Sequence, residues 1–161
     1  MSRNRYEDID AALSKSLDDF LKILDKLELK IPNMPKNILL FNSPITFGKK
    51  DALEMGNLYP RIGIASIAAY LLDKGREVNL IDPNAEQLDL AEVKNKISKL
   101  NPDIVGIPAY TEEIHDADYT AKITKEVNPE IITVVCGPHA SAIPAETLQE
   151  FSDFDIAVVG E

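Results

Sequence analysis

The stretch DLAEVKNKISKLNPDIVGI, residues 89–107, decides the fold because it joins a helical pattern directly to a buried strand. The apolar face of the helical part consists of Leu90, Val93, Ile97 and Leu100. These residues recur at spacings of three and four, which predicts an amphipathic helix, and Asp89 is placed to cap it. The run at 104–107 is short and apolar without polar alternation, as in strands buried on both faces. A helix feeding such a strand predicts an α/β fold with a parallel sheet.

The same alternation extends to both sides of this stretch. Further strands are expected at residues 38–41, 78–81, 131–135 and 156–159. Helices are expected at residues 62–74, from Ile114 to the Asn128-Pro129 pair, and after Pro144. Five parallel strands with helices between them predict a flavodoxin-like, doubly wound sheet with the strand order 2-1-3-4-5 over residues 35–161.

Residues 1–34 differ from this pattern and are predicted to form a helical extension and a linker. One apolar stripe at helical spacing contains Ile9, Leu13, Leu17, Phe20, Leu24 and Leu27. Pro32 and Pro35 then end the helix. We expect the stripe to pack on this domain or on a second copy, which would make a homo-oligomer. The chain stops directly after the fifth strand, so we also expect it to be cut from a longer protein, and the N-terminal helix could cover that strand.

Composition narrows the classes of partner. The chain has 17 Lys and Arg against 27 Asp and Glu, for a net charge of −10. Such an acidic body repels phosphates, so we expect no nucleic-acid partner. Cys136 is the single cysteine, so the chain can form no internal disulfide and cannot ligate an iron–sulfur cluster alone. No apolar run is long enough to span a membrane and no signal peptide is recognisable, so a cytoplasmic location and no membrane partner are expected.

The ligand site of an open α/β sheet lies at the carboxyl ends of the strands, where the strand order reverses. A loop of roughly twenty residues follows the first strand, and loops of that length are usually functional. Gly137 would let a flat ligand approach the backbone, and Ser43, Thr111 and Ser141 offer hydroxyl groups. The candidate cofactor-binding residues are Asn42, Ser43, Pro44, Arg61, Ile62, Gly63, Tyr110, Thr111, Gly137, Pro138, His139, Ser141, Gly160 and Glu161. No catalytic residue and no metal ligand is predicted.

Other functions of this fold class do not match the residues. A phosphoacceptor receiver domain needs acidic residues after strand one and an Asp at the end of strand three, where this chain has Asn42-Ser43 and Ile107-Pro108. The loop after strand one lacks the compact phosphate loop of a flavodoxin, and no G-x-G-x-x-G or Walker A motif is present. His115, among acidic neighbours, could be a metal ligand but is better explained by a solvated helix face. Cys136 is interpreted as a small buried apolar residue.

Five blocks of sequence, in this order and spacing, resemble a known family. They are YPRIGIASIAAYL (59–71), KGREV (74–78), DIVGI (103–107), GPHAS (137–141) and DIAVVGE (155–161). Together they resemble the N-terminal cobalamin-binding domain of cobalamin-dependent radical SAM enzymes, over about residues 36–161. That family includes methyltransferases of unactivated carbon and phosphorus and the anaerobic oxidative cyclase of magnesium-protoporphyrin monomethyl ester.

The resemblance implies that cobalamin is the cofactor, positioned so that methylcobalamin faces a C-terminal radical SAM domain. The [4Fe-4S] cluster and S-adenosylmethionine would belong to that domain, because this chain lacks the C-x-x-x-C-x-x-C motif. The chain departs from the family where Cys136 replaces the first Gly of Gly-Gly-Pro-His. The Asp-x-His-x-x-Gly motif of classical B12 domains is also absent, as in similar radical SAM proteins, so no cobalt-ligating histidine is expected from the first loop. His139 would either contact the corrin or bond local backbone.

One alternative of a different class stays open at this point. A flavodoxin-like domain without a cofactor could serve interaction or regulation, with its acidic surface and N-terminal helix used for assembly. Binding of cobalamin would separate the two functions.

Overall fold

The computed structural model describes residues 37–43 and 62–160 of the 161-residue chain. The predicted N-terminal helix and linker lie outside the described residues, as do three candidate site residues, Pro44, Arg61 and Glu161.

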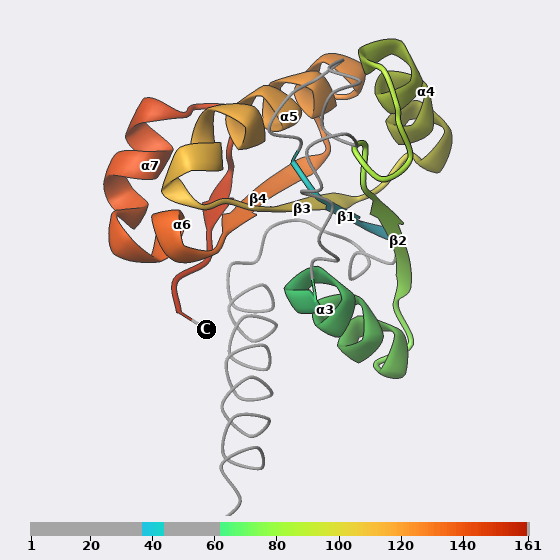
Figure 1. Ribbon diagram of the computed structural model, residues 1–161, viewed down its shortest axis with the longest axis horizontal. Coiled ribbons are helices and arrows are strands. Elements are labelled where there is room, and N and C mark those ends of the chain that lie inside the picture. Colours follow the sequence, from blue (N-terminus) through green and yellow to red (C-terminus); the bar gives the residue numbers. More distant parts are fainter. Residues whose placement is uncertain (1–36, 44–61, 161) are drawn as a thin grey trace, which may run out of the picture.

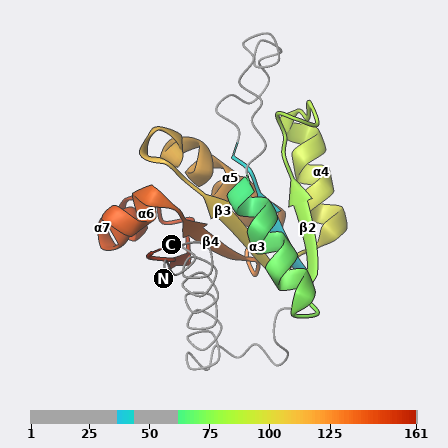
Figure 2. The same ribbon diagram turned by 60° about the horizontal axis from the view of Figure 1, so that its bottom comes forward.

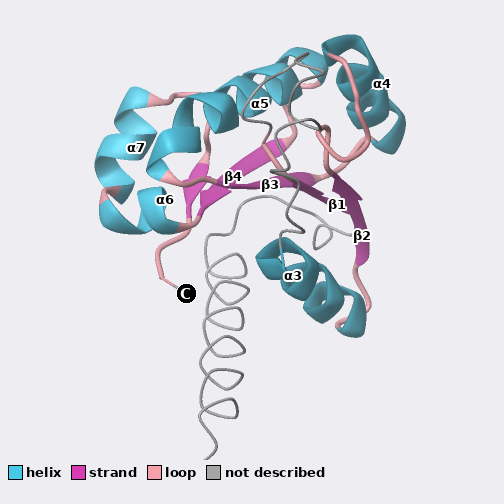
Figure 3. Ribbon diagram, viewed as in Figure 1, coloured by secondary structure: helices cyan, strands magenta, loops and turns pink. Residues whose placement is uncertain are grey.

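A five-stranded, all-parallel sheet forms the centre of the molecule (Figures 1 and 3). Its strands are β1 (Asn37–Phe41), β2 (Glu77–Ile81), β3 (Ile104–Pro108), β4 (Ile132–Cys136) and β5 (Ile156–Ala157). Their order is β2-β1-β3-β4-β5. This order confirms the predicted flavodoxin-like topology, in which the order reverses between β1 and β3.

Helices cover both faces of the sheet. They are α3 (Ile62–Asp73), α4 (Leu90–Leu100), α5 (Ile114–Val127), α6 (Pro138–Ala142) and α7 (Pro144–Glu150), and a short 3₁₀ turn, η1 (Thr111–Glu113), precedes α5. Figure 1 shows α4 and α5 above the sheet and α3 below it. Figure 2 turns the face with α3 toward the reader.

Two apolar clusters correspond to the two faces. The larger one joins the odd-numbered side chains of β1, β3 and β4 to α4 and α5, and it includes the fully buried Leu39, Val105 and Val135. The smaller one packs Ile64 and Leu71 of α3 on even-numbered side chains of β1. Because both faces are covered, the strands need apolar residues at successive positions, which explains their continuous Ile and Val runs.

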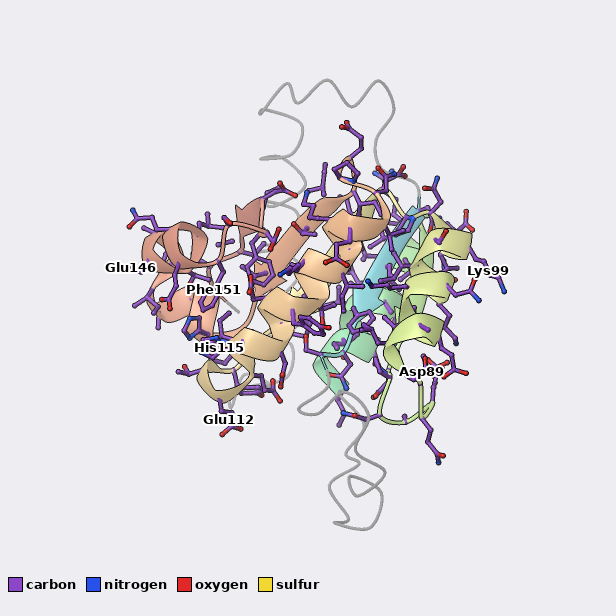
Figure 4. The ribbon with its side chains drawn as sticks, turned by 90° about the horizontal axis from the view of Figure 1, so that it is seen from above. Asp89, Lys99, Glu112, His115, Glu146 and Phe151 are labelled. Atoms are coloured by element: carbon purple, nitrogen blue, oxygen red, sulfur yellow. The ribbon has the colours of Figure 1, made fainter. Side chains whose placement is uncertain are left out.

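The predicted cap of α4 is present. Asp89 accepts a hydrogen bond from the backbone N–H of Glu92 at 2.8 Å, and Glu92 accepts one from the N–H of Asp89 at 2.9 Å. This reciprocal pair is a capping box, which satisfies two N–H groups that a helix start leaves free. Lys99 lies in the last turn, at the opposite end of α4 from Asp89 (Figure 4), where a cation complements the helix dipole.

Two segments differ from the sequence prediction. The segment after β4, predicted as a loop, forms the short helix α6, because Gly137 turns the chain at a positive φ of 98° and Pro138 then supplies a helical φ at the first position. β5 ends at Ala157 instead of Val159. β5 is an edge strand, and its one neighbour in the sheet is β4. Beyond Ala157, one further hydrogen bond continues this pairing, from the N–H of Val158 to the carbonyl of Val135.

The amino end of β4 is joined to β5 through Asp155. Its carboxylate accepts hydrogen bonds from the backbone N–H of Thr133 at 2.7 Å and from Lys125 Nζ at 2.6 Å. Thr133 Oγ1 also donates to the carbonyl oxygen of Asp153. Burial raises the pKa of Asp155, but the hydrogen bonds from Lys125 and Thr133 outweigh that effect and hold the pKa below its ordinary value.

This arrangement predicts a pH-dependent contribution of Asp155 to stability. A carboxyl whose pKa is lower in the folded than in the unfolded chain stabilises the fold above its unfolded pKa of about 4, and that stabilisation is lost as the pH falls through the lowered folded value. Asp155→Asn should therefore lower the free energy of unfolding at neutral pH, and its difference from the parent chain should shrink in acid.

Urea unfolding at a series of pH values measures this difference. Asp73→Asn, at the exposed end of α3, is the matched control and should show little difference at any pH. A difference for Asp155→Asn that stayed constant through the acid range would contradict the assignment.

Candidate functional site

The carboxyl ends of the strands meet at one edge, and the strand registers state which residues are neighbours there. Phe41 pairs with Ile81, Leu40 with Gly106, and Pro108 with Cys136. Continuing these registers past the strands brings the segments after β1, β3 and β4 side by side. The candidate residues on those segments therefore share one edge, as the topology predicts.

Asn42 is buried at this edge and its polar groups are used internally. Its N–H donates to the carbonyl of Ile81 at 2.9 Å, and its Nδ2 donates to Asp82 Oδ2 at 2.9 Å. Asp82 Oδ1 in turn accepts from the N–H groups of Asn84 and Ala85. Sequence reasoning did not select Asp82, although its place directly after β2 was the signal that could have found it. Asn42 and Asp82 together fix the β1–β2 end of the edge.

Ser43 follows Asn42 and is the notable polar residue at this edge. It is 1% exposed, and its Oγ has no hydrogen-bond partner within the described part of the chain. A buried hydroxyl without a partner costs about 1–3 kcal/mol, so native proteins rarely keep one without a reason. Ser43 Oγ is therefore suited to receive a ligand group.

The segment after β3 is fixed to the segment after β4 by the backbone of Ala109. The N–H of Ala109 donates to the carbonyl of Cys136 at 2.8 Å, and the carbonyl of Ala109 accepts from the N–H of His139 at 3.3 Å. The next two residues, Tyr110 and Thr111, are exposed. They present side chains at the edge, as predicted.

The backbone around Gly137 has no room for a side chain. A Cβ built on Gly137 would lie 2.9 Å from the carbonyl oxygen and 3.2 Å from the nitrogen of Ala109. Its φ of 98° is also one that residues with side chains rarely adopt. The glycine is thus required by the close approach of the chain to its own backbone. That Gly137 also lets a flat ligand approach stays a prediction.

His139 lies in α6 and is 7% exposed. Its Nδ1 is 3.3 Å from Thr111 Oγ1, and its ring meets the ring of Phe151 edge-on with 6.5 Å between centroids. Its Nε2 is buried and has no partner among the described residues. The imidazole thus joins α6 to the segment after β3 and has one nitrogen left over.

The exposed His115 lies beside Phe151 as well (Figure 4), with ring centroids 5.5 Å apart. Burial raises the pKa of the nearby Asp116, and the charge of Glu113 raises it further. Burial also raises the pKa of Asp118, to which the charge of Asp153 adds. Over residues 37–43 and 62–160, no three His, Cys, Asp or Glu side chains are grouped so that they could hold a metal ion. His115 contributes a ring contact.

Ser141 connects the end of β4 to the end of β5. Its Oγ accepts a hydrogen bond from the N–H of Gly160 at 3.1 Å, and its own N–H donates to the carbonyl of Gly137. Pro138 is exposed at the start of α6. These candidates lie on the β4 and β5 side of the edge, and the Ser141 hydroxyl already has one partner.

The remaining candidates at the described part of the edge are Ile62 and Gly63, which begin α3 and are exposed. Their role in binding stays a prediction. Cys136 is half-buried, and desolvation raises the pKa of its thiol to about 11. None of the helices in the described ranges is long and apolar enough to cross a membrane.

Comparison with known proteins agrees with this geometry. The family described as the B12 binding domain matches residues 48–161. An uncharacterized methyltransferase of Pyrococcus horikoshii is 36% identical over 107 residues, which is 66% of this chain and 23% of that protein. The anaerobic magnesium-protoporphyrin IX monomethyl ester cyclase of Rubrivivax gelatinosus is 38% identical over 109 residues, 67% of this chain and 20% of the cyclase.

A third relative, the cytidylyl-2-hydroxyethylphosphonate methyltransferase of Streptomyces wedmorensis, is 26% identical over 144 residues, or 78% of this chain and 26% of that protein. The chain thus spans roughly a quarter or less of the length of these relatives. The family match covers well over half of the chain and lies on the predicted fold with the predicted strand order. It confirms the resemblance drawn from the sequence, and the chain belongs to the family of B12 binding domains.

Proposed function

We propose that this chain is a cobalamin-holding module whose site is the edge formed by the carboxyl ends of β1, β3 and β4. The observation that carries the proposal is Ser43 Oγ, a hydroxyl that is buried at this edge without a partner among the described residues. We propose that the missing partner is a polar group of cobalamin. Membership of the family supports cobalamin as the ligand, and the topological rule for α/β sheets supports this edge as its place.

His139 Nε2 is a second group that fits a polar ligand. It is buried without a described partner, in the segment that the register brings next to the segment after β3. A corrin carries polar side groups that both donate and accept hydrogen bonds, so it can satisfy the hydroxyl and the imidazole together. The residues present therefore fit cobalamin, and the exposed Tyr110, Thr111 and Pro138 extend the contact surface.

The chain contributes binding and orientation. Cobalamin supplies group-transfer chemistry through its cobalt, and the protein positions and shields it. His139 is held by Thr111 and Phe151, and we expect it to contact the edge of the ligand without bonding to cobalt. Asn42 holds the β1–β2 end of the site through its bond to Asp82.

We further propose that the module works within a longer cobalamin-dependent radical SAM enzyme. The relatives are several times longer than this chain, and their names describe two methyltransferases and a cyclase. In this proposal a further domain carries the [4Fe-4S] cluster and S-adenosylmethionine, because Cys136 alone cannot ligate a cluster. The substrate then belongs to that domain, and methyl transfer or oxidative cyclisation is the class of reaction.

The first prediction concerns cobalamin itself. The chain, incubated with hydroxocobalamin and desalted, should retain the visible spectrum of the cofactor in about a one-to-one ratio. The spectrum should show no protein nitrogen bound to cobalt, because the His139 ring is fixed by its neighbours. A colourless protein after a full titration would refute the proposal and favour an interaction domain without a cofactor.

The second prediction separates binding from stability at Ser43. Ser43→Ala removes a buried hydroxyl that has no described partner, so the free energy of unfolding should stay unchanged or rise. The affinity for hydroxocobalamin should fall by about tenfold, as expected for one lost hydrogen bond. Urea unfolding and a spectroscopic titration measure the two quantities.

Thr133→Val is the matched control for Ser43→Ala. Thr133 is equally buried, but its hydroxyl donates to the carbonyl of Asp153. Its loss should lower stability by about 1 kcal/mol and leave the affinity for hydroxocobalamin unchanged. If Ser43→Ala bound hydroxocobalamin as tightly as the parent chain, the hydroxyl would lie outside the site.

The third prediction concerns Gly137. Gly137→Val should destabilise the fold by about 1–3 kcal/mol, because the new side chain meets the Ala109 backbone at a strained φ. Gly63→Ala is the control, since a Cβ there has open space within a helix. Denaturant unfolding of both variants without cobalamin measures the free energy of unfolding. A Gly137→Val variant as stable as the parent chain would show that the segments after β3 and β4 can separate without loss of stability.

A further inference from the structure

The face of the sheet that carries α3 is only partly accounted for. Side chains alternate between the two faces of a strand, so the even-numbered residues of β3, β4 and β5 share the face with α3. The apolar contacts of α3 reach β1 and β2, through Ile38, Leu40 and Val78. The rest of that face, here called the β4 face, consists of Ile104, Ile132, Val134, Ile156 and Val158.

Burial on the β4 face indicates a missing neighbour. Ile104 and Val134 are 6% and 5% exposed, yet they belong to neither of the two clusters formed by the described residues. Ile132, Ile156 and Val158 around them are partly exposed. Five large aliphatic side chains side by side need an apolar cover, because contiguous patches of this kind are rarely left in water.

We infer that residues 9–27 of this chain form an amphipathic helix that docks its apolar stripe on the β4 face, next to α3. The stripe from Ile9 to Leu27 offers six large apolar residues on one side of the predicted helix. The opposite side carries charged residues such as Asp18 and Lys22, which would remain in water. The helix thus has the one apolar side that a half-covered sheet requires.

The chain lengths allow this packing. Nineteen helical residues extend over about 28 Å, which is longer than a five-residue strand. Residues 28–36 lead directly into β1 and can span up to about 30 Å when extended. From β1, the strand β4 is two positions away in the sheet, at about 10 Å, because neighbouring strands are about 4.8 Å apart. The linker therefore reaches the β4 face without displacing α3.

Cys136 is a natural reporter for the inferred contact. It is the single cysteine, and its position in β4 places it on the same face as Val134, two residues away. A helix on the β4 face would shield the thiol, and opening of that helix would expose it. The rate at which a small neutral maleimide labels Cys136 therefore reports how often the helix leaves the β4 face. The measurement needs no cobalamin.

The experiment compares the rate of maleimide labelling in the full chain and in two variants. Leu17→Ala removes apolar area from the stripe while keeping helix propensity, and should speed labelling by about tenfold by favouring local opening. Asp18→Ala, on the charged side of the same turn, is the matched control and should label like the parent chain. Sedimentation equilibrium should report a monomer for all three.

Equal labelling rates in all three proteins would overturn the inference. A dimer whose protection of Cys136 is lost on dilution would also overturn it, since the cover would then come from a second copy. If the Leu17→Ala variant fails to fold, hydrogen exchange on the unmodified chain still tests the inference. In hydrogen exchange, the amides of residues 9–27 should be protected in the monomer, and unprotected amides there would refute the contact.

Discussion

The shape of the proposed ligand edge depends on one close contact, in which the backbone at Gly137 passes against the backbone of Ala109. The contact leaves no room for a Cβ, and the hydrogen bonds from Ala109 to Cys136 and from His139 to Ala109 enclose it on both sides. It ties the ends of β3 and β4 together before either segment meets a ligand. The start of α6 and the orientation of His139 follow from this contact, because α6 begins at the next residue.

Polar groups inside the domain fall into two classes that differ in their partners. Thr120, Thr124 and Thr147 are buried, and each donates its hydroxyl to a carbonyl four residues earlier in its helix. Ser43 Oγ and His139 Nε2 are equally buried but have no described partner, and both belong to the ligand edge. The distinction matters because an unpaired buried group weakens the free protein and strengthens its affinity for whatever pairs with it. If cobalamin binds as proposed, the edge is the place where the domain gives up stability for binding.

Much of the fold was predictable because its signals are local. The Ile and Val runs predicted all five strands, and Asp89 predicted the start of α4, since periodicity and capping depend on neighbours along the chain. The site was less predictable. Nothing in the sequence around Ser43 states that its hydroxyl lacks a partner, and the reason for Gly137 lies in Ala109, which is distant along the chain. Asp82 was missed because its partner Asn42 follows a different strand, far away along the chain.

The position of β1 in the sheet has a consequence for the order of folding. β1 comes first along the chain among the described strands, yet it lies between β2 and β3, and its Leu39 and Phe41 are fully buried. Its partners on β3 come 66 positions later, where Asn37 also bonds to Asp103. During synthesis, β1 can pair with β2 first, but its other edge must stay unpaired until β3 has left the ribosome. Parallel sheets close such distant contacts slowly, so the edge of β1 that faces β3 has a long exposure to aggregation and to chaperones.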